Sequence, residues 1–122
     1  MIRGVHTMFY SSDAEELRSF IRDKLQFPHT DVGHGWLIFD LPEADMGCHP
    51  AGQGEHDRAG THDISFYCDD LDATIAELKS RGVEFVEGVT DAGFGRVTRF
   101  QMPGGVTAQL YQPRYVKQPA GR

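Results

Sequence analysis

The chain has 122 residues, a formal net charge of −6, and 39% hydrophobic and 25% charged residues. This length fits one domain with its own core, and the composition is typical of globular proteins. The acidic balance argues against a nucleic-acid partner, because proteins that bind the phosphate backbone carry basic surfaces. Neither an apolar signal segment nor a run long enough to span a bilayer is present. We therefore expect a cytoplasmic protein without a membrane partner.

The first patterned segment runs from residue 5 to residue 27. "VHTMFYSSD" alternates as a strand does, and Ser12 with Glu15 has the spacing of a capping box. Apolar residues then recur at helical spacing through "AEELRSFIRDKLQF". "GWLIFDLP" and "DMGCHP" follow as strand-like pieces. The first half thus predicts a strand, a helix and further strands.

The second half repeats this order after a linker, "AGQGEHDRAG" at residues 51–60. "HDISFYCDD" is strand-like, and Asp70 is expected to cap a helix that ends at Gly82. "VEFVEGV", "RVTRFQMP" and "VTAQLYQP" follow as strands, with a hairpin turn at Pro103-Gly104-Gly105. We predict module one at 1–50, module two at 61–113 and a tail at 114–122, all within one domain, 1–122.

Two strand–helix–strand units can share a curved sheet, with the helices outside and a concave face inside. The order of elements therefore predicts an α+β domain with a ligand cavity on the concave face.

Three stretches, "VHTMFYSSD", "CDDLDATIAELKSRGVEF" and "MPGGVTAQLYQP", resemble the vicinal oxygen chelate superfamily. That group holds glyoxalase I, extradiol dioxygenases, fosfomycin-resistance transferases and bleomycin-resistance proteins, and the resemblance covers nearly the whole chain. It implies two βαβββ modules that form a curved, mostly antiparallel sheet around a cavity for a small molecule. It also implies a divalent metal in many members, and a homodimer in which both chains complete the cavities.

In the metal-binding members, the ligands come from the first and last strands of each module. Strand alternation tests which side chains here can face inward. The inward sets are His6, Met8 and Tyr10 in the first half, and Asp63, Ser65 and Tyr67 in the second. His6 therefore pairs with Asp63 rather than with His62.

The last strands supply the other two positions. Gln109 stands where the family typically carries a glutamate, and Met46 or Cys48 takes the matching place in the first half. An amide is a weak ligand, so His6 and Asp63 are the expected metal ligands, with Gln109 and His49 as weaker candidates. The cation would be iron, manganese, nickel or zinc.

The cavity is also expected to be aromatic. Tyr10, Tyr67 and Tyr111 face inward by the same alternation, with Trp36 beside them, which suits an aromatic ligand. The glycine-punctuated loop "TDAGFGRVTR", residues 90–99, is a candidate cover. Either Arg96 or Arg99 could meet an anionic group of the ligand, or both could be surface charges.

Three functions remain open on these residues. In a metal-assisted lyase, isomerase or dioxygenase, the cation would hold two vicinal oxygens of the substrate. Glyoxalase I activity is disfavoured, because the amide of Gln109 cannot act as a general base. The second function is metal-free sequestration of an antibiotic or another small molecule. The third is a metal-free enzyme with His6 as its catalytic base.

Overall fold

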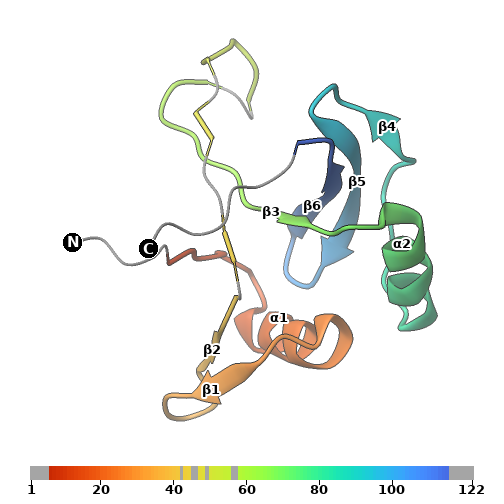
Figure 1. Ribbon diagram of the computed structural model, residues 1–122. Helices are drawn as coiled ribbons and strands as arrows, with labels where there is room; N and C mark the ends of the chain where they lie inside the picture. Colours follow the sequence, from red (N-terminus) through yellow and green to blue (C-terminus); the bar gives the residue numbers. More distant parts are fainter. Residues whose placement is uncertain (1–5, 42, 45–46, 49, 56–57, 116–122) are drawn as a thin grey trace, which may run out of the picture.

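The computed structural model describes residues 6–41, 43–44, 47–48, 50–55 and 58–115. Their elements, in chain order, are α1 (Ala14–Phe20), the π-helix η1 (Ile21–Leu25), β1 (His29–Asp31), β2 (Leu37–Phe39), β3 (Ser65–Tyr67), α2 (Leu71–Ser80), β4 (Thr90–Asp91), β5 (Gly95–Met102) and β6 (Val106–Pro113). This mixture of helices and mostly antiparallel strands confirms the predicted α+β class (Figure 1). In the part of the chain that is described, no helix has the length and apolar character to cross a membrane.

The described strands form two separate sheets. β1 and β2 make an antiparallel pair, and the larger sheet has the order β3-β6-β5-β4. β5 and β6 are joined by the predicted turn at residues 103–105, and Met102 pairs with Val106 at its base. β3 runs parallel to β6, whereas the other pairs of this sheet are antiparallel.

The helix-facing side of the larger sheet carries the core. Phe100 and Met102 of β5 and Ala108 and Leu110 of β6 are buried there, at alternate positions along each strand. They form one cluster with residues of α1, η1 and α2, namely Leu17, Phe20, Ile21, Leu71 and Leu78. The other face of β5 and β6 is therefore left free of the helices.

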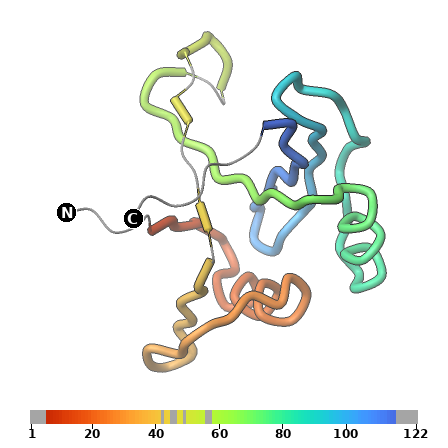
Figure 2. The backbone as a smooth tube through the Cα atoms, in the orientation of Figure 1, coloured from red at the N-terminus to blue at the C-terminus, as the bar shows by residue number. Residues whose placement is uncertain are grey.

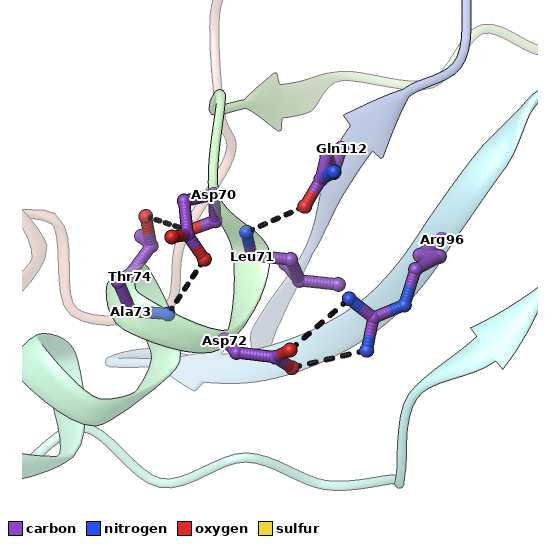
Figure 3. Close-up of polar contacts among 7 residues, drawn as sticks. All are labelled: Asp70, Leu71, Asp72, Ala73, Thr74, Arg96 and Gln112. Atoms are coloured by element: carbon purple, nitrogen blue, oxygen red, sulfur yellow. Dashed lines mark hydrogen bonds and ion pairs between the residues drawn. The ribbon is translucent and has the colours of Figure 1, made fainter.

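Helix α2 begins and ends where the sequence predicts. The Asp70 carboxylate accepts a hydrogen bond from Ala73 N at 3.0 Å, and the Gln112 side chain accepts one from Leu71 N at 2.8 Å (Figure 3). After the last turn, Gly82 adopts φ +85° and its N–H donates to Lys79 O.

Helix α1 begins differently, and the predicted Ser12–Glu15 capping box is wrong. Asp13 caps the helix instead, because its carboxylate accepts from Glu16 N at 3.2 Å. Ser11 Oγ donates to Pro103 O at 2.9 Å, and Ser12 N donates to Gly104 O at 3.0 Å. These contacts with the β5–β6 turn fix the entry to the helix, which a local pattern cannot report.

Some predicted strands do not form. In the first half, residues 6–10 are in no strand, and β1 lies at His29–Asp31, where the sequence predicted none. In the second half, "VEFVEGV" contributes only a bridge between Phe85 and Phe100. A segment forms a strand only where a second backbone pairs with it. In the described residues the two sheets are not joined, so residues 6–10 lack such a pairing partner. The chain path (Figure 2) carries the described part of the 51–60 linker to the end opposite the β1–β2 hairpin.

Candidate functional site

An open cleft of about 1900 Å³ lies between segments of the first half and the second half, around the edge of β3 that no described strand covers. It is lined from the first half by parts of 6–10, 25–27 and 41–51, and from the second by parts of 58–69, 74–81, 94–100 and β6, so it reaches residues on both faces of the larger sheet. The predicted cavity residues that line it are His6, Met8, Tyr10, Asp63, Ser65, Tyr67, Gln109 and Tyr111. His62 and Cys48 line it as well.

Trp36 is the predicted cavity residue that the structure does not bring to the cleft. Its ring is 51% exposed beside the β1–β2 hairpin, and the Arg18 guanidinium lies 5.1 Å from the ring centroid. Trp36 directly precedes β2, which belongs to the smaller sheet. Alternation along the strands of the larger sheet therefore does not determine where its side chain lies.

An aromatic row crosses the helix-free face of the larger sheet. Tyr67 of β3 pairs in register with Tyr111 of β6, and their ring centroids are 5.8 Å apart. The ring of Phe94 meets Tyr111 edge-on at 5.3 Å, and the hydroxyls of Tyr111 and Tyr115 are 2.8 Å apart. The Tyr67 hydroxyl donates to the Glu43 carboxylate. Glu43 and Tyr115 were missed from the sequence, whereas Phe94 lies in the glycine-punctuated loop that was a candidate cover.

An ion pair holds Phe94 beside Tyr111. The Arg114 guanidinium donates to both carboxylate oxygens of Asp91 at 2.5 Å, and Arg114 N donates to Phe94 O at 2.8 Å. The hydrogen bonds from Arg114 lower the pKa of the Asp91 carboxyl to about 2. The carboxylate therefore stays charged at neutral pH and keeps the turn between β4 and β5 attached to the end of β6.

A polar row lies next to the aromatic one, two residues along the strands. Ser65 of β3 pairs in register with Gln109 of β6, which pairs with Arg99 of β5. Gln109 Nε2 donates to Ser65 Oγ at 3.1 Å, and Arg99 Nε lies 3.3 Å from a Glu87 carboxylate oxygen.

The predicted metal ligands that the structure describes are His6, Asp63 and Gln109. Among the residues that the structure describes, no three His, Cys, Asp or Glu side chains come together in a metal-binding group. The amide of Gln109 is engaged with Ser65, and His6 and Asp63 are both exposed. Met46 and His49 lie outside the described residues. This donor set does not fit the divalent cation that many members of the family carry.

Comparison with known proteins assigns the chain to a family. The sequence profile of the Glyoxalase/Bleomycin resistance protein/Dioxygenase superfamily matches residues 3–110, and the chain belongs to that superfamily. This confirms the resemblance seen in the sequence.

Several solved structures share the fold. An antibiotic-binding protein from Streptomyces sp. CB03234 is 25% identical, with 93% of this chain and 99% of that one covered and a TM-score of 0.61. A glyoxalase/bleomycin resistance protein from the same organism is 27% identical over 84% of this chain and 93% of that one, with a TM-score of 0.54. A superfamily member from Sphaerobacter thermophilus is 23% identical over 91% and 98%, with a TM-score of 0.62. No protein with curated function matches the chain significantly.

Proposed function

We propose that this protein binds an aromatic small molecule in the cleft and sequesters it without a metal. The observation that carries the proposal is the aromatic row of Tyr67, Tyr111 and Phe94 on a sheet face that the helices leave free. Aromatic side chains favour flat ligands, because stacked and edge-on ring contacts add to the free energy of burial. The likeness to an antibiotic-binding protein over nearly the full length of both chains supports the same mode of action.

The metal-assisted lyase, isomerase or dioxygenase has weaker support from the donor chemistry. Its ligand set would include Gln109, which is a neutral amide already bonded to Ser65. The metal-free enzyme would need His6 as base, and His6 lines the cleft as an exposed side chain. An exposed His6 could contact a bound ligand or act as a base. Its exposure therefore does not favour the metal-free enzyme over the binding protein.

We further propose that the protein acts as a homodimer in the cytoplasm. The cleft exceeds the roughly 300–1000 Å³ of typical ligand sites, so a second copy would fill part of it. Met8, Leu41 and Phe94 line the cleft with 45%, 44% and 46% of their surface exposed, which suits burial against a partner. Cys48 and Cys68 are free thiols, as expected in a reducing compartment.

Calorimetric titration with a panel of polycyclic aromatic antibiotics tests the binding function. We expect at least one compound to bind, and Tyr67→Leu to weaken it about tenfold, which corresponds to about 1.4 kcal/mol. Phe85→Leu is the matched control, because Phe85 packs on the helix-facing side against Phe100. Silence of the wild-type protein across the panel would contradict the proposal.

A second measurement separates sequestration from metal chemistry. Manganese, nickel, iron or zinc should leave the Tm of the wild-type protein unchanged. A rise in Tm that His6→Ala abolishes would replace the proposal with the metal-assisted enzyme.

A further inference from the structure

A smaller pocket of about 230 Å³ opens beside the cleft. It is lined by Met8, Phe9, Tyr10, His62, Asp63, Ile64, Ser65, Arg99, Thr107 and Gln109. Ser65 and Gln109 also line the cleft, so the two spaces meet at the polar row. A ligand whose rings lie in the cleft can therefore extend a substituent into this pocket.

Strand register fixes how far that substituent must reach. The polar row of Ser65, Gln109 and Arg99 is two residues along the strands from the row of Tyr67 and Tyr111. At about 3.4 Å per residue, this separation is about 7 Å along the strands, and Arg99 stands on β5, one strand spacing of about 4.8 Å to the side of Gln109.

Arg99 is the cation of this pocket. Its Nε faces Glu87 at 3.3 Å, and its side chain keeps 44% of its surface exposed. A guanidinium has five N–H donors in a planar fork, so one contact at Nε leaves the terminal nitrogens able to bind a second oxyanion.

Arg96, on the same strand, provides the contrast. Its terminal nitrogens both donate to the Asp72 carboxylate, at 3.0 and 3.2 Å, on the helix-facing side of the sheet (Figure 3). Arg96 and Arg99 are an odd number of residues apart, so they lie on opposite faces. Arg99 is the one that faces the pocket.

Two carboxylates near this pocket limit where an anion can sit. Glu87 occupies its Nε edge, and Asp63 lines the same pocket. Asp63 lies two residues before Ser65, on the side away from Tyr67, so an anionic group next to the aromatic row meets Arg99 before it meets Asp63.

We propose that the ligand carries an oxyanion, a carboxylate or sulfonate, about 7 Å along the strand direction from the ring held at Tyr67 and Tyr111, and that Arg99 binds it. This inference rests on the proposed function and names the class of ligand: an anionic aromatic compound, in spite of the net negative charge of the chain. The Glu43 carboxylate at the Tyr67 hydroxyl orients such a ligand, because it repels the anionic end from the aromatic row.

A matched pair of fluorescent probes tests the proposal. 6-Anilinonaphthalene-2-sulfonate and N-phenyl-2-naphthylamine share one ring system, and only the first carries a sulfonate, at the end of the naphthalene opposite the anilino group. We expect the wild-type protein to bind the sulfonate at least tenfold more tightly in fluorescence titrations. Arg99→Gln should weaken the sulfonate about tenfold and change the neutral probe less than twofold, and Arg99→Lys should give an intermediate loss.

Two further variants complete the experiment. Arg96→Gln removes one positive charge from the opposite face and should leave both affinities unchanged. Tyr67→Leu should weaken both probes, which places them in the cleft.

Equal binding of the two probes, or an equal effect of Arg99→Gln and Arg96→Gln, would overturn the role of Arg99 while the proposed aromatic binding stands. If the wild-type protein bound neither probe, both the proposed function and the role of Arg99 would be overturned. Because the Arg99 side chain is partly exposed and its carbonyl accepts from Val86 N through the backbone, the variant is expected to fold, and circular dichroism checks this.

Discussion

At the scale of single residues, the sequence shows which side chains of a strand share a face. It does not show which residues of other elements each face contacts. Ser65, Tyr67, Gln109 and Tyr111 line one cleft, but Phe66 and Leu110, at the intervening positions of the same strands, line it as well. Alternation also separates Arg96 from Arg99, yet it does not say which of them faces the helices. That depends on Asp72 of α2 lying beside Arg96, which is a contact between distant elements.

The turn between β5 and β6 shows how one residue can connect the two halves of the chain. Gly104 has φ +83°, and a Cβ there would lie 1.8 Å from Ser11 Oγ and 2.6 Å from Asp13 N. Gly105 has φ +80°, but a Cβ there would have no atom of the described residues within 4 Å, apart from its chain neighbours. A side chain at either glycine would therefore strain the backbone. Only at Gly104 would it also clash with the residues that lead into α1.

We expect Gly104→Ala to lower the free energy of unfolding by roughly 2 to 4 kcal/mol, since it combines positive-φ strain with a clash. Gly105→Ala carries the strain alone and should cost about 1 to 2 kcal/mol. Urea unfolding monitored by circular dichroism measures both. Equal losses for the two variants would show that the contact between this turn and residues 11–13 does not form in solution.

At the scale of elements, α2 could be predicted at both ends because its signals are local. Asp70 caps its own helix within three residues, and Gly82 ends it. The strands of the first half could not be predicted in the same way, because a strand needs a partner from elsewhere in the chain. The predicted cap of α1 was wrong for a related reason, because Ser11 and Ser12 form hydrogen bonds with the distant turn at residues 103–104.

The cap of α2 gives a prediction at this scale. Asp70→Ala removes the acceptor of Ala73 N and should lower the free energy of unfolding by about 1 kcal/mol. The matched control is Asp69→Ala, at the exposed neighbouring position outside the cap, and it should change stability by less than about 0.5 kcal/mol. Urea unfolding of the two variants under identical conditions measures both changes in the free energy of unfolding. Similar changes for the two variants would contradict the capping role of Asp70.

At the scale of the whole molecule, the cleft is too wide for a small ligand alone. In the described residues, β3 pairs with β6 and leaves its other edge without a strand, while the first half forms a separate sheet. Exposed apolar side chains line the space between them. These features together favour a second copy of the chain over an unaccompanied monomer.

We therefore expect sedimentation equilibrium to give about 27 kDa, twice the 13.6 kDa of one chain. Met8→Glu places a charge in the cleft and should weaken the dimer by at least tenfold in Kd, because a carboxylate is costly to bury. Val32→Glu, on the β1–β2 hairpin and 62% exposed, is the control and should leave the dimer intact. A monomer at all concentrations for the wild-type protein would contradict the dimer.

The sequence by itself determined the α+β class, the superfamily resemblance and the ends of α2. Each of these depends on periodicity or on capping over a few residues, and such signals are local. Only the tertiary structure decided that Gln109 bonds to Ser65, that Arg96 is held by Asp72, and that Phe94 joins Tyr111. Those contacts join residues from different elements, so their geometry depends on how the chain packs and not on any short stretch of it.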